Sequence, residues 1–211
     1  MQWYHYTMNA VEHIVESYYR LCHNCFTYSD VKVDAGNNRQ IDILAVSLEK
    51  DQHYHIECSV THCLQWCPTP KKLIAEFEKK FSGHPKKKDG ENTDSAKGKR
   101  YGGAITATYR RLGMKLGSVK RVWVCWSIKN PATLKDELAD YYGRTGNMVD
   151  VIELRDTVLP ELLKAVSTAN YDDEILRVFS LIKQAEAQTR KRLEKVERPA
   201  SSSRLRRAAR G

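Results

Sequence analysis

The order of hydrophobic and polar positions predicts a helix followed by three strands in the first third of the chain. Apolar residues recur with helical spacing over 8–21, where Glu12 and Glu16 lie four positions apart beside the apolar stripe. Three segments rich in β-branched and aromatic residues follow, separated by Gly36-Asn37-Asn38 and by a polar turn. We therefore expect a helix and a three-stranded meander, with strands at 26–33, 41–48 and 53–61.

The rest of the chain predicts strands that alternate with helices. Helical spacing resumes over 68–81, with prolines near its start, where they are tolerated. The largely apolar run 119–128 predicts a central strand. Strands that alternate with helices fold most economically as a mixed sheet covered on its faces, so we predict an α/β fold. The remaining expected elements are helices at 105–116, 134–142, 157–166 and 172–197 and a strand at 148–154.

Two carboxylates interrupt this strand pattern. Asp42 lies within an otherwise apolar stretch, and burying it without a cation or hydrogen-bond donors is costly. Glu57 belongs to a polar face of the third strand, and a short turn joins the two strands, so we expect both carboxylates to be close enough to share a cation. A solvent-exposed edge position is the alternative for Asp42. The polar face consists of His53, His55, Glu57, Ser59 and Thr61, and we expect its histidines to be partly exposed.

This pair of carboxylates has the chemistry of a magnesium site. Mg²⁺, or Mn²⁺ in its place, takes oxygen ligands and keeps several waters for a phosphate substrate. Such a metal polarises a phosphodiester oxygen and generates hydroxide from bound water. Glu12, on a helix expected to pack against the sheet, is placed to complete the site. The candidate metal ligands are therefore Asp42 and Glu57.

With these residues in this order, the chain resembles the PD-(D/E)XK phosphodiesterase superfamily, the restriction-endonuclease-like fold. The closest likeness is to its Mrr-type restriction endonucleases and resolvase-like members, over roughly residues 8–155. The matching features are the helix with Glu12, the hairpin 36–43, the strand 56–60 and the helix and strand that follow.

This resemblance implies a fold, an activity and roles for three residues. The fold is a mixed β-sheet flanked by helices with an αβββαβ core, to which this chain adds a C-terminal helical extension. The activity is metal-dependent hydrolysis of phosphodiester bonds in DNA by an endonuclease, as in restriction or defence. Asp42 and Glu57 are implied to be metal ligands, and Glu12 an auxiliary acid.

Ser59 departs from the family pattern, which usually has lysine at this position. An ammonium there orients the attacking water and offsets charge in the transition state, whereas a hydroxyl only forms hydrogen bonds. Three alternatives stay open: Lys79 or Lys80 on the next helix supplies the ammonium, Ser59 supports a slow metal-dependent reaction, or the domain is a non-catalytic nucleic-acid-binding module. The candidate catalytic residues are Glu12, Asp42, Glu57 and Ser59.

Charge is distributed unevenly along the 211 residues. Lysine and arginine outnumber aspartate and glutamate by 35 to 26, for a formal net charge of +9. Segment 71–121 carries +10 and segment 186–211 carries +6, whereas segments 1–70 and 122–185 carry −4 and −3. A localised surplus of this kind favours an anionic partner, with nucleic acid ahead of an acidic membrane surface.

The first basic segment predicts contacts with the nucleic-acid backbone. Residues 83–102 contain almost no apolar side chains, which is typical of a long mobile loop. Lysines and arginines on such a loop hold phosphates without reading sequence. The predicted nucleic-acid-binding residues are Lys79, Lys80, Lys86, Lys87, Lys88, Lys97, Lys99 and Arg100.

The overall organisation predicted is a restriction-endonuclease-like domain at 1–170, a helix at 171–197 and a disordered basic tail at 198–211. Apolar residues make up 41% of the chain, enough for a sizeable core. We find no pattern of a signal peptide and no apolar run long enough for a membrane span, so we expect a cytoplasmic protein. DNA is the expected partner, with a homodimer as a further possibility, and the last helix is the expected surface for any protein partner.

The cysteines suggest a weaker hypothesis of a zinc site. Cys22 and Cys25 are spaced as zinc ligands, whereas Cys63 and Cys67 are spaced less typically. The first pair precedes the first strand and the second pair follows the third, so we expect the pairs at opposite ends of the sheet. Buried, reduced thiols are the favoured interpretation.

Overall fold

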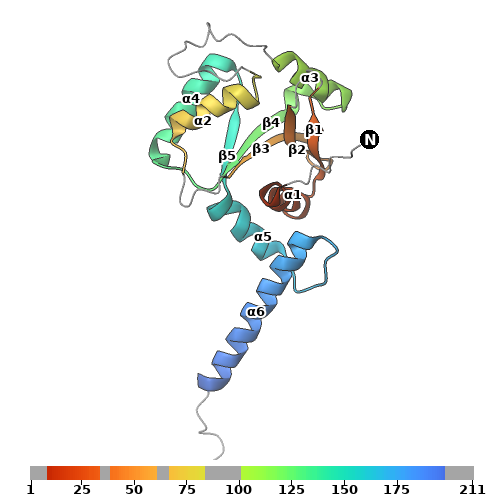
Figure 1. The fold of residues 1–211 in the computed structure, drawn as a ribbon, viewed down its shortest axis with the longest axis vertical. Coiled ribbons are helices and arrows are strands. Elements are labelled where there is room, and N and C mark those ends of the chain that lie inside the picture. The colour runs from red at the N-terminus through yellow and green to blue at the C-terminus, as the bar shows by residue number, and fades with distance from the viewer. Residues whose placement is uncertain (1–8, 34–38, 61–66, 84–100, 198–211) are drawn as a thin grey trace, which may run out of the picture. The chain divides into compact units, whose positions relative to one another are not determined.

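The computed structural model describes residues 9–33, 39–60, 67–83 and 101–197, and Figure 1 shows their fold. Five strands form one mixed sheet in the order β1-β2-β3-β4-β5. The first three form an antiparallel meander, and the last two run parallel to β3. The strands are β1 (Phe26–Lys32), β2 (Gln40–Ser47), β3 (Gln52–Ser59), β4 (Val119–Cys125) and β5 (Val149–Glu153).

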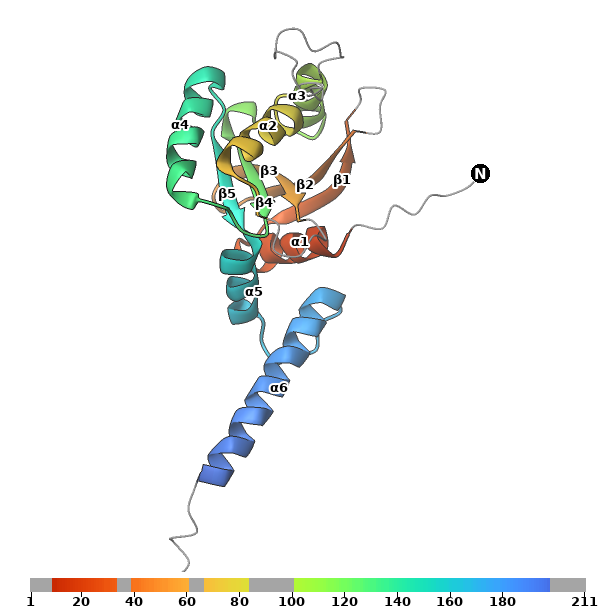
Figure 2. The same ribbon diagram turned by 60° about the vertical axis from the view of Figure 1, so that its left-hand side comes forward.

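Helices cover both faces of this sheet, as Figures 1 and 2 show. On one face α1 contacts the meander, with the rings of Tyr19 and Tyr54 5.3 Å apart. On the other face α2 packs beside α4, and Phe77 of α2 lies 5.4 Å from Trp123 of β4. The predicted α/β class and mixed sheet flanked by helices are therefore confirmed. The first five α-helices are α1 (Ala10–Cys22), α2 (Pro70–Lys80), α3 (Gly102–Arg111), α4 (Leu134–Thr145) and α5 (Leu159–Ala165).

The predicted elements are all present, and their ends differ for local reasons. The helix expected over 105–116 is α3 at 102–111, because Gly113 adopts the left-handed conformation (φ +70°) just beyond its end. Residues 116–118 then form a separate 3₁₀ turn. The helix expected over 134–142 continues to Thr145, where Gly146 (φ +67°) ends it in the same way.

His53, His55 and Glu57 on the polar face of β3 are buried, so the expectation that the histidines are partly exposed was wrong. His55 has no exposed surface, and His53 is also buried. The ring of His55 lies 4.8 Å from Phe81 and 5.7 Å from Tyr109. The physical reason is that the ends of α2 and α3 cover this side of the strand, so that both of its faces belong to the interior.

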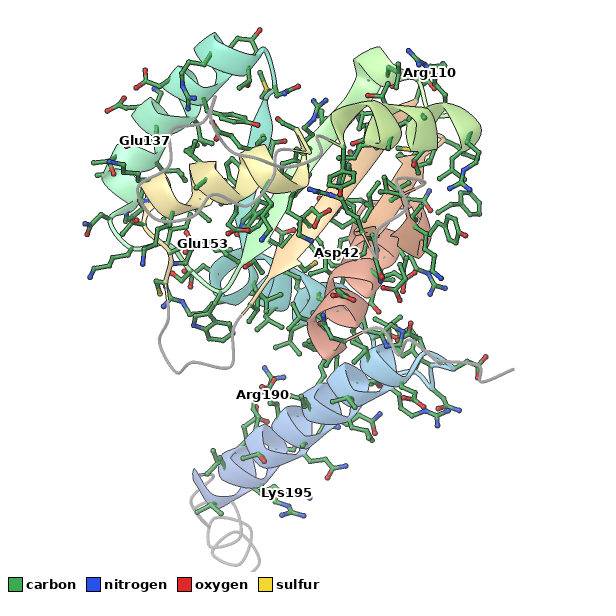
Figure 3. All side chains as sticks on the ribbon, turned by 45° about the horizontal axis from the view of Figure 1, so that its top comes forward. Asp42, Arg110, Glu137, Glu153, Arg190 and Lys195 are labelled. Atoms are coloured by element: carbon green, nitrogen blue, oxygen red, sulfur yellow. The ribbon has the colours of Figure 1, made fainter. Side chains whose placement is uncertain are left out.

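Contacts divide the chain into two compact units, Met1–Leu162 and Leu163–Gly211. The second unit contains α6 (Glu174–Glu197). Its first turns are fixed by the residues just before them, since Ser180 Oγ donates to the carbonyl of Ala169 at 2.7 Å and Lys183 Nζ donates to that of Lys164 at 3.1 Å. Arg190 and Lys195, labelled in Figure 3, belong to its exposed later turns. The predicted tail at 198–211 lies outside the described residues.

None of the helices in the described ranges is both long enough and apolar enough to cross a membrane.

Candidate active site

Asp42 and Glu57 lie together on one face of the sheet. Ile43 of β2 pairs with Ile56 of β3, and the antiparallel register continued by one residue sets Asp42 opposite Glu57. Both carboxylates contact the ammonium of Lys80, and Asp42 Oδ2 also accepts the backbone N–H of Cys58 at 2.8 Å. Asp42 is 9% exposed and Glu57 1% exposed. Asp42, labelled in Figure 3, therefore belongs to a nearly buried pair of carboxylates and not to a solvated edge.

Lys80 is the cation of this pair. Its Nζ forms an ion pair with Glu57 Oε2 and lies 3.5 Å from Asp42 Oδ1. Phe77, one turn earlier on α2, packs on Trp123, so the same side of the helix that anchors α2 carries Lys80 over the sheet. Lys79 pairs instead with Glu76, at 3.0 Å. Of the two lysines considered from the sequence, Lys80 therefore reaches the carboxylates.

Glu12 reaches the same region from the first turn of α1. Asn9 caps this helix: its side chain accepts the backbone N–H of Glu12 at 3.1 Å, and its own backbone N–H donates to Glu12 Oε2 at 3.3 Å. This capping box fixes both the start of the helix and the carboxylate. Glu12 is 9% exposed and lies within electrostatic range of Asp42. The structure thus brings Glu12, Asp42, Glu57 and Lys80 together.

The pKa values of these groups follow from their crowding. Burial raises the pKa of Glu12 to about 7, and the nearby charge of Asp42 adds to this. Burial also raises the pKa of Asp42 to about 6, with Glu57 as the second cause and Lys80 opposing both. Burial raises the pKa of Glu57 as well. Burial alone lowers the pKa of Lys80, but Glu57 and Asp42 outweigh it and raise that pKa to about 12, so the ammonium keeps its charge.

A small cavity opens beside these side chains. Its volume is about 340 Å³, and Arg39, Asp42 and Lys80 are among the residues around it. Arg39 donates from Nη2 to the backbone carbonyl of Lys80 at 3.4 Å, and its guanidinium lies 5.5 Å from the centre of the Tyr101 ring. Arg39 is a functional candidate that the sequence argument missed. Its position just before the Asp42 strand is the signal that identifies it.

Behind Glu57 lies a second missed candidate, His55. Its Nε2 is 2.8 Å from Glu57 Oε1, and its Nδ1 bonds to the hydroxyl of Tyr109 on α3. Complete burial lowers the pKa of His55 to about 3, so its imidazole is neutral. The alternation of residues along β3 does place His55 on the side of Glu57, but it does not show that helices cover both.

The remaining predicted site residues line another cavity or lie outside the described residues. Ser59 lines a different cavity, of about 370 Å³, together with Trp123 and Lys72. The hypothesis of a zinc site stays untested, since Cys63 also lies outside the described ranges. The basic residues outside them are Lys86, Lys87, Lys88, Lys97, Lys99 and Arg100.

The donor atoms of Asp42 and Glu57 fit Mg²⁺ or Mn²⁺. Both supply carboxylate oxygens, and Mg²⁺ is commonly held by one or two carboxylates with waters and substrate phosphates as its other ligands. Within the described ranges no group of three or more histidine, cysteine, aspartate and glutamate side chains is arranged to hold a metal ion. A metal bound here would therefore depend on water and on the substrate for the rest of its coordination.

Comparison of the chain with protein-family models, with curated proteins and with solved structures finds no match. The chemistry of the site has to be argued from its own residues. Two adjacent carboxylates, one ammonium and one arginine around a small cavity combine metal ligands with cations that attract a phosphate.

Proposed function

We propose that the protein is a metal-dependent endonuclease of the restriction-endonuclease-like fold that hydrolyses phosphodiester bonds in DNA. The observation that carries the proposal is the contact of Lys80 with both Glu57 and Asp42. It supplies, from α2, the ammonium that Ser59 does not. The chain order of α1, the β1–β3 meander, α2 and β4 supports the proposal, because it is the αβββαβ order of that fold.

In this proposal Asp42 and Glu57 hold Mg²⁺ or Mn²⁺. The bound metal would polarise the phosphodiester and lower the pKa of a water. Lys80 orients the attacking water and offsets the charge that develops on the phosphate. Its ion pair with Glu57 also opposes the effect of burial, which raises the pKa of that carboxyl. Glu12 is the auxiliary acid, with a pKa of about 7 that suits proton transfer near neutral pH.

The phosphate backbone would approach through the cavity beside Asp42. Arg39 and Lys79 line this cavity with Lys80, so three cations meet the phosphate there. The basic stretch from Lys86 to Arg100 adds sequence-independent attraction for the duplex. The proposed partners and cofactor are therefore DNA and Mg²⁺ or Mn²⁺.

A non-catalytic nucleic-acid-binding module is the second candidate. The observation that favours it is again Lys80, since its ammonium already offsets part of the negative charge of the carboxylate pair without a metal. An ammonium in contact with buried carboxylates can serve a purely structural role, since it offsets their charge in the folded protein. The two candidates differ in one property, metal-dependent cleavage.

Supercoiled plasmid incubated with the full chain and Mg²⁺ or Mn²⁺ tests the proposal. We expect nicking that is abolished by a chelator and reduced at least about 1,000-fold by Asp42→Asn or Glu57→Gln. Asp150→Asn, at an exposed position of β5, is the matched control and should cleave like the natural chain.

DNA binding is measured in parallel by fluorescence anisotropy. Retained binding by Asp42→Asn with lost cleavage supports the endonuclease. Salt-dependent binding by every variant, with no cleavage by the natural chain in either metal, supports the binding module instead. Absence of both activities contradicts both candidates.

A further inference from the structure

We infer that His55 is a positioning residue that fixes the carboxylate of Glu57, and that Tyr109 in turn fixes the imidazole of His55. The inference deepens the proposed function and rests on it for its catalytic consequence. The chain of contacts runs from α3 along the covered face of β3 to α2, by way of Tyr109, His55, Glu57 and Lys80.

Each oxygen of Glu57 has its own partner. Oε1 is 2.8 Å from His55 Nε2, and Oε2 pairs with Lys80. Partners on both oxygens fix the rotation of the carboxylate about its terminal bond, which is otherwise a broad torsion. His55 thereby determines which oxygen of Glu57 faces Lys80 and Asp42.

The hydrogen-bond inventory assigns one tautomer to His55. A carboxylate only accepts, so Nε2 must carry the ring proton and donate it to Glu57. Nδ1, which faces the hydroxyl of Tyr109, is then the acceptor of that hydroxyl proton. The opposite tautomer would direct a nitrogen lone pair at the Glu57 carboxylate in a fully buried place.

Burial on this face does not by itself produce such contacts. His53 lies on the same side of β3, two residues earlier, and is also buried. Its Nδ1 has no hydrogen-bond partner among the described residues. The link between His55 and Glu57 is therefore a specific arrangement, and His53 supplies a matched control.

The functional consequence is an ordered ligand for the proposed metal. Residues that orient metal-ligating carboxylates and histidines typically contribute about 10- to 100-fold to metal affinity or activity. His55 does not reach the cavity itself, so it acts through Glu57 and not on the substrate. We expect its loss to lower kcat and metal affinity while the KM for DNA stays within about threefold.

Four variants test this inference: His55→Leu, His55→Gln, Tyr109→Phe and the control His53→Leu. His55→Leu should lower kcat about 10- to 100-fold and weaken Mn²⁺ binding, measured by calorimetry without DNA. His55→Gln, whose amide can donate to Glu57, should recover most of both. Tyr109→Phe should give an intermediate loss, and His53→Leu should stay within about threefold of the natural chain. Equal effects of His55→Leu and His53→Leu on kcat and Mn²⁺ affinity would overturn the inference.

Nitrogen NMR of the natural chain provides a readout that does not depend on activity. We expect the His55 signals of an imidazole protonated at Nε2, with the Nδ1 signal shifted in Tyr109→Phe. A ring protonated at Nδ1 overturns the inference whether or not the protein cleaves DNA. If the natural chain fails to cleave but the NMR shows the expected tautomer, the proposed function fails and the positioning of Glu57 stands.

Discussion

Lys80 of α2 and Glu57 of β3 form an ion pair across the face of the sheet, and the same ammonium lies 3.5 Å from Asp42. The two residues are 23 positions apart in the sequence. Their contact depends on the packing of α2 against β4, where Phe77 and Phe81 surround the ring of Trp123. The cation of the site is thus held by a helix, whereas the two acids are held by the strand register.

Lys80→Met should show whether cleavage needs the ammonium at this position or only the overall positive charge of the protein. We expect plasmid cleavage to fall at least about 100-fold, because the developing negative charge loses its nearest ammonium. Lys71→Met, at an exposed position in the first turn of the same helix, is the control and should change cleavage less than about threefold. Rates are compared well below the melting temperatures, since Lys80→Met also leaves two buried carboxylates without their cation. Equal losses in both variants would contradict the role of Lys80.

Ser59→Lys in the Lys80→Met background tests whether the ammonium can be supplied from β3. Ser59 is two residues after Glu57 and therefore on the same side of the strand. A lysine at 59 should recover cleavage at least about tenfold over Lys80→Met alone, measured with the same plasmid assay. Ser59→Ala in the same background is the control, and recovery there would mean that the lysine charge is not the cause.

Much of this fold could be predicted from the sequence because its elements are defined by local patterns. Helical spacing, strand alternation and turn residues gave every helix and strand of the described sheet. The burial of His55 could not be predicted, because it depends on α2 and α3, which follow β3 in the chain and cover it only in the folded protein.

The two acidic residues of the candidate site could be predicted from the sequence, whereas its lysine could be narrowed only to two neighbouring residues. Asp42 and Glu57 stood out because carboxylates are rare in strands with an apolar environment. Lys79 and Lys80 could not be separated by composition. The spacing of Leu73, Phe77 and Lys80 on one side of α2 is a signal that favours Lys80, since the first two are buried.

Arg39→Gln should weaken the approach of the phosphate without removing catalysis. We expect the KM for DNA to rise about three- to tenfold, with kcat changed less, because a guanidinium that binds ground state and transition state alike contributes mainly to affinity. Steady-state cleavage of a short labelled duplex measures both constants. Arg20→Gln, in the last turn of α1, is the control for loss of one positive charge. A change in kcat alone would place Arg39 in the chemical step instead.

Mg²⁺ or Mn²⁺ should stabilise the natural chain in the absence of DNA. A metal that binds only the folded state at 100 times its Kd contributes about 2.7 kcal/mol, which raises the melting temperature by several degrees. Differential scanning fluorimetry at pH 8 measures this shift. Asp42→Asn should show none of it, whereas Asp150→Asn should show all of it. A shift that persists in Asp42→Asn would locate the metal elsewhere.

Glu12→Gln should stabilise the protein increasingly as the pH rises. The pKa of Glu12 is about 7 in the folded state against 4.5 ordinarily, so the folded state holds this proton more tightly than the unfolded state does. The stability that this proton contributes is fully present below pH 4.5 and is lost as the pH rises through 7. Glutamine carries no charge at any pH and still accepts the backbone N–H of Asn9, so it keeps the capping box.

The melting temperature of Glu12→Gln minus that of the natural chain should therefore be near zero at pH 4.5 and clearly positive at pH 8. At pH 8 the free energy of unfolding should rise by on the order of 1–3 kcal/mol. Glu16→Gln, one turn later on α1, is the control for the amide substitution, since Glu16 accepts the Thr27 hydroxyl at 2.7 Å on the surface of the helix. If both variants follow the same pH course, the burial of Glu12 beside Asp42 is not the cause. If only Glu12→Gln gains stability with pH, the ionised carboxylate of Glu12 destabilises the folded protein. Such a destabilising group is expected where a residue serves catalysis.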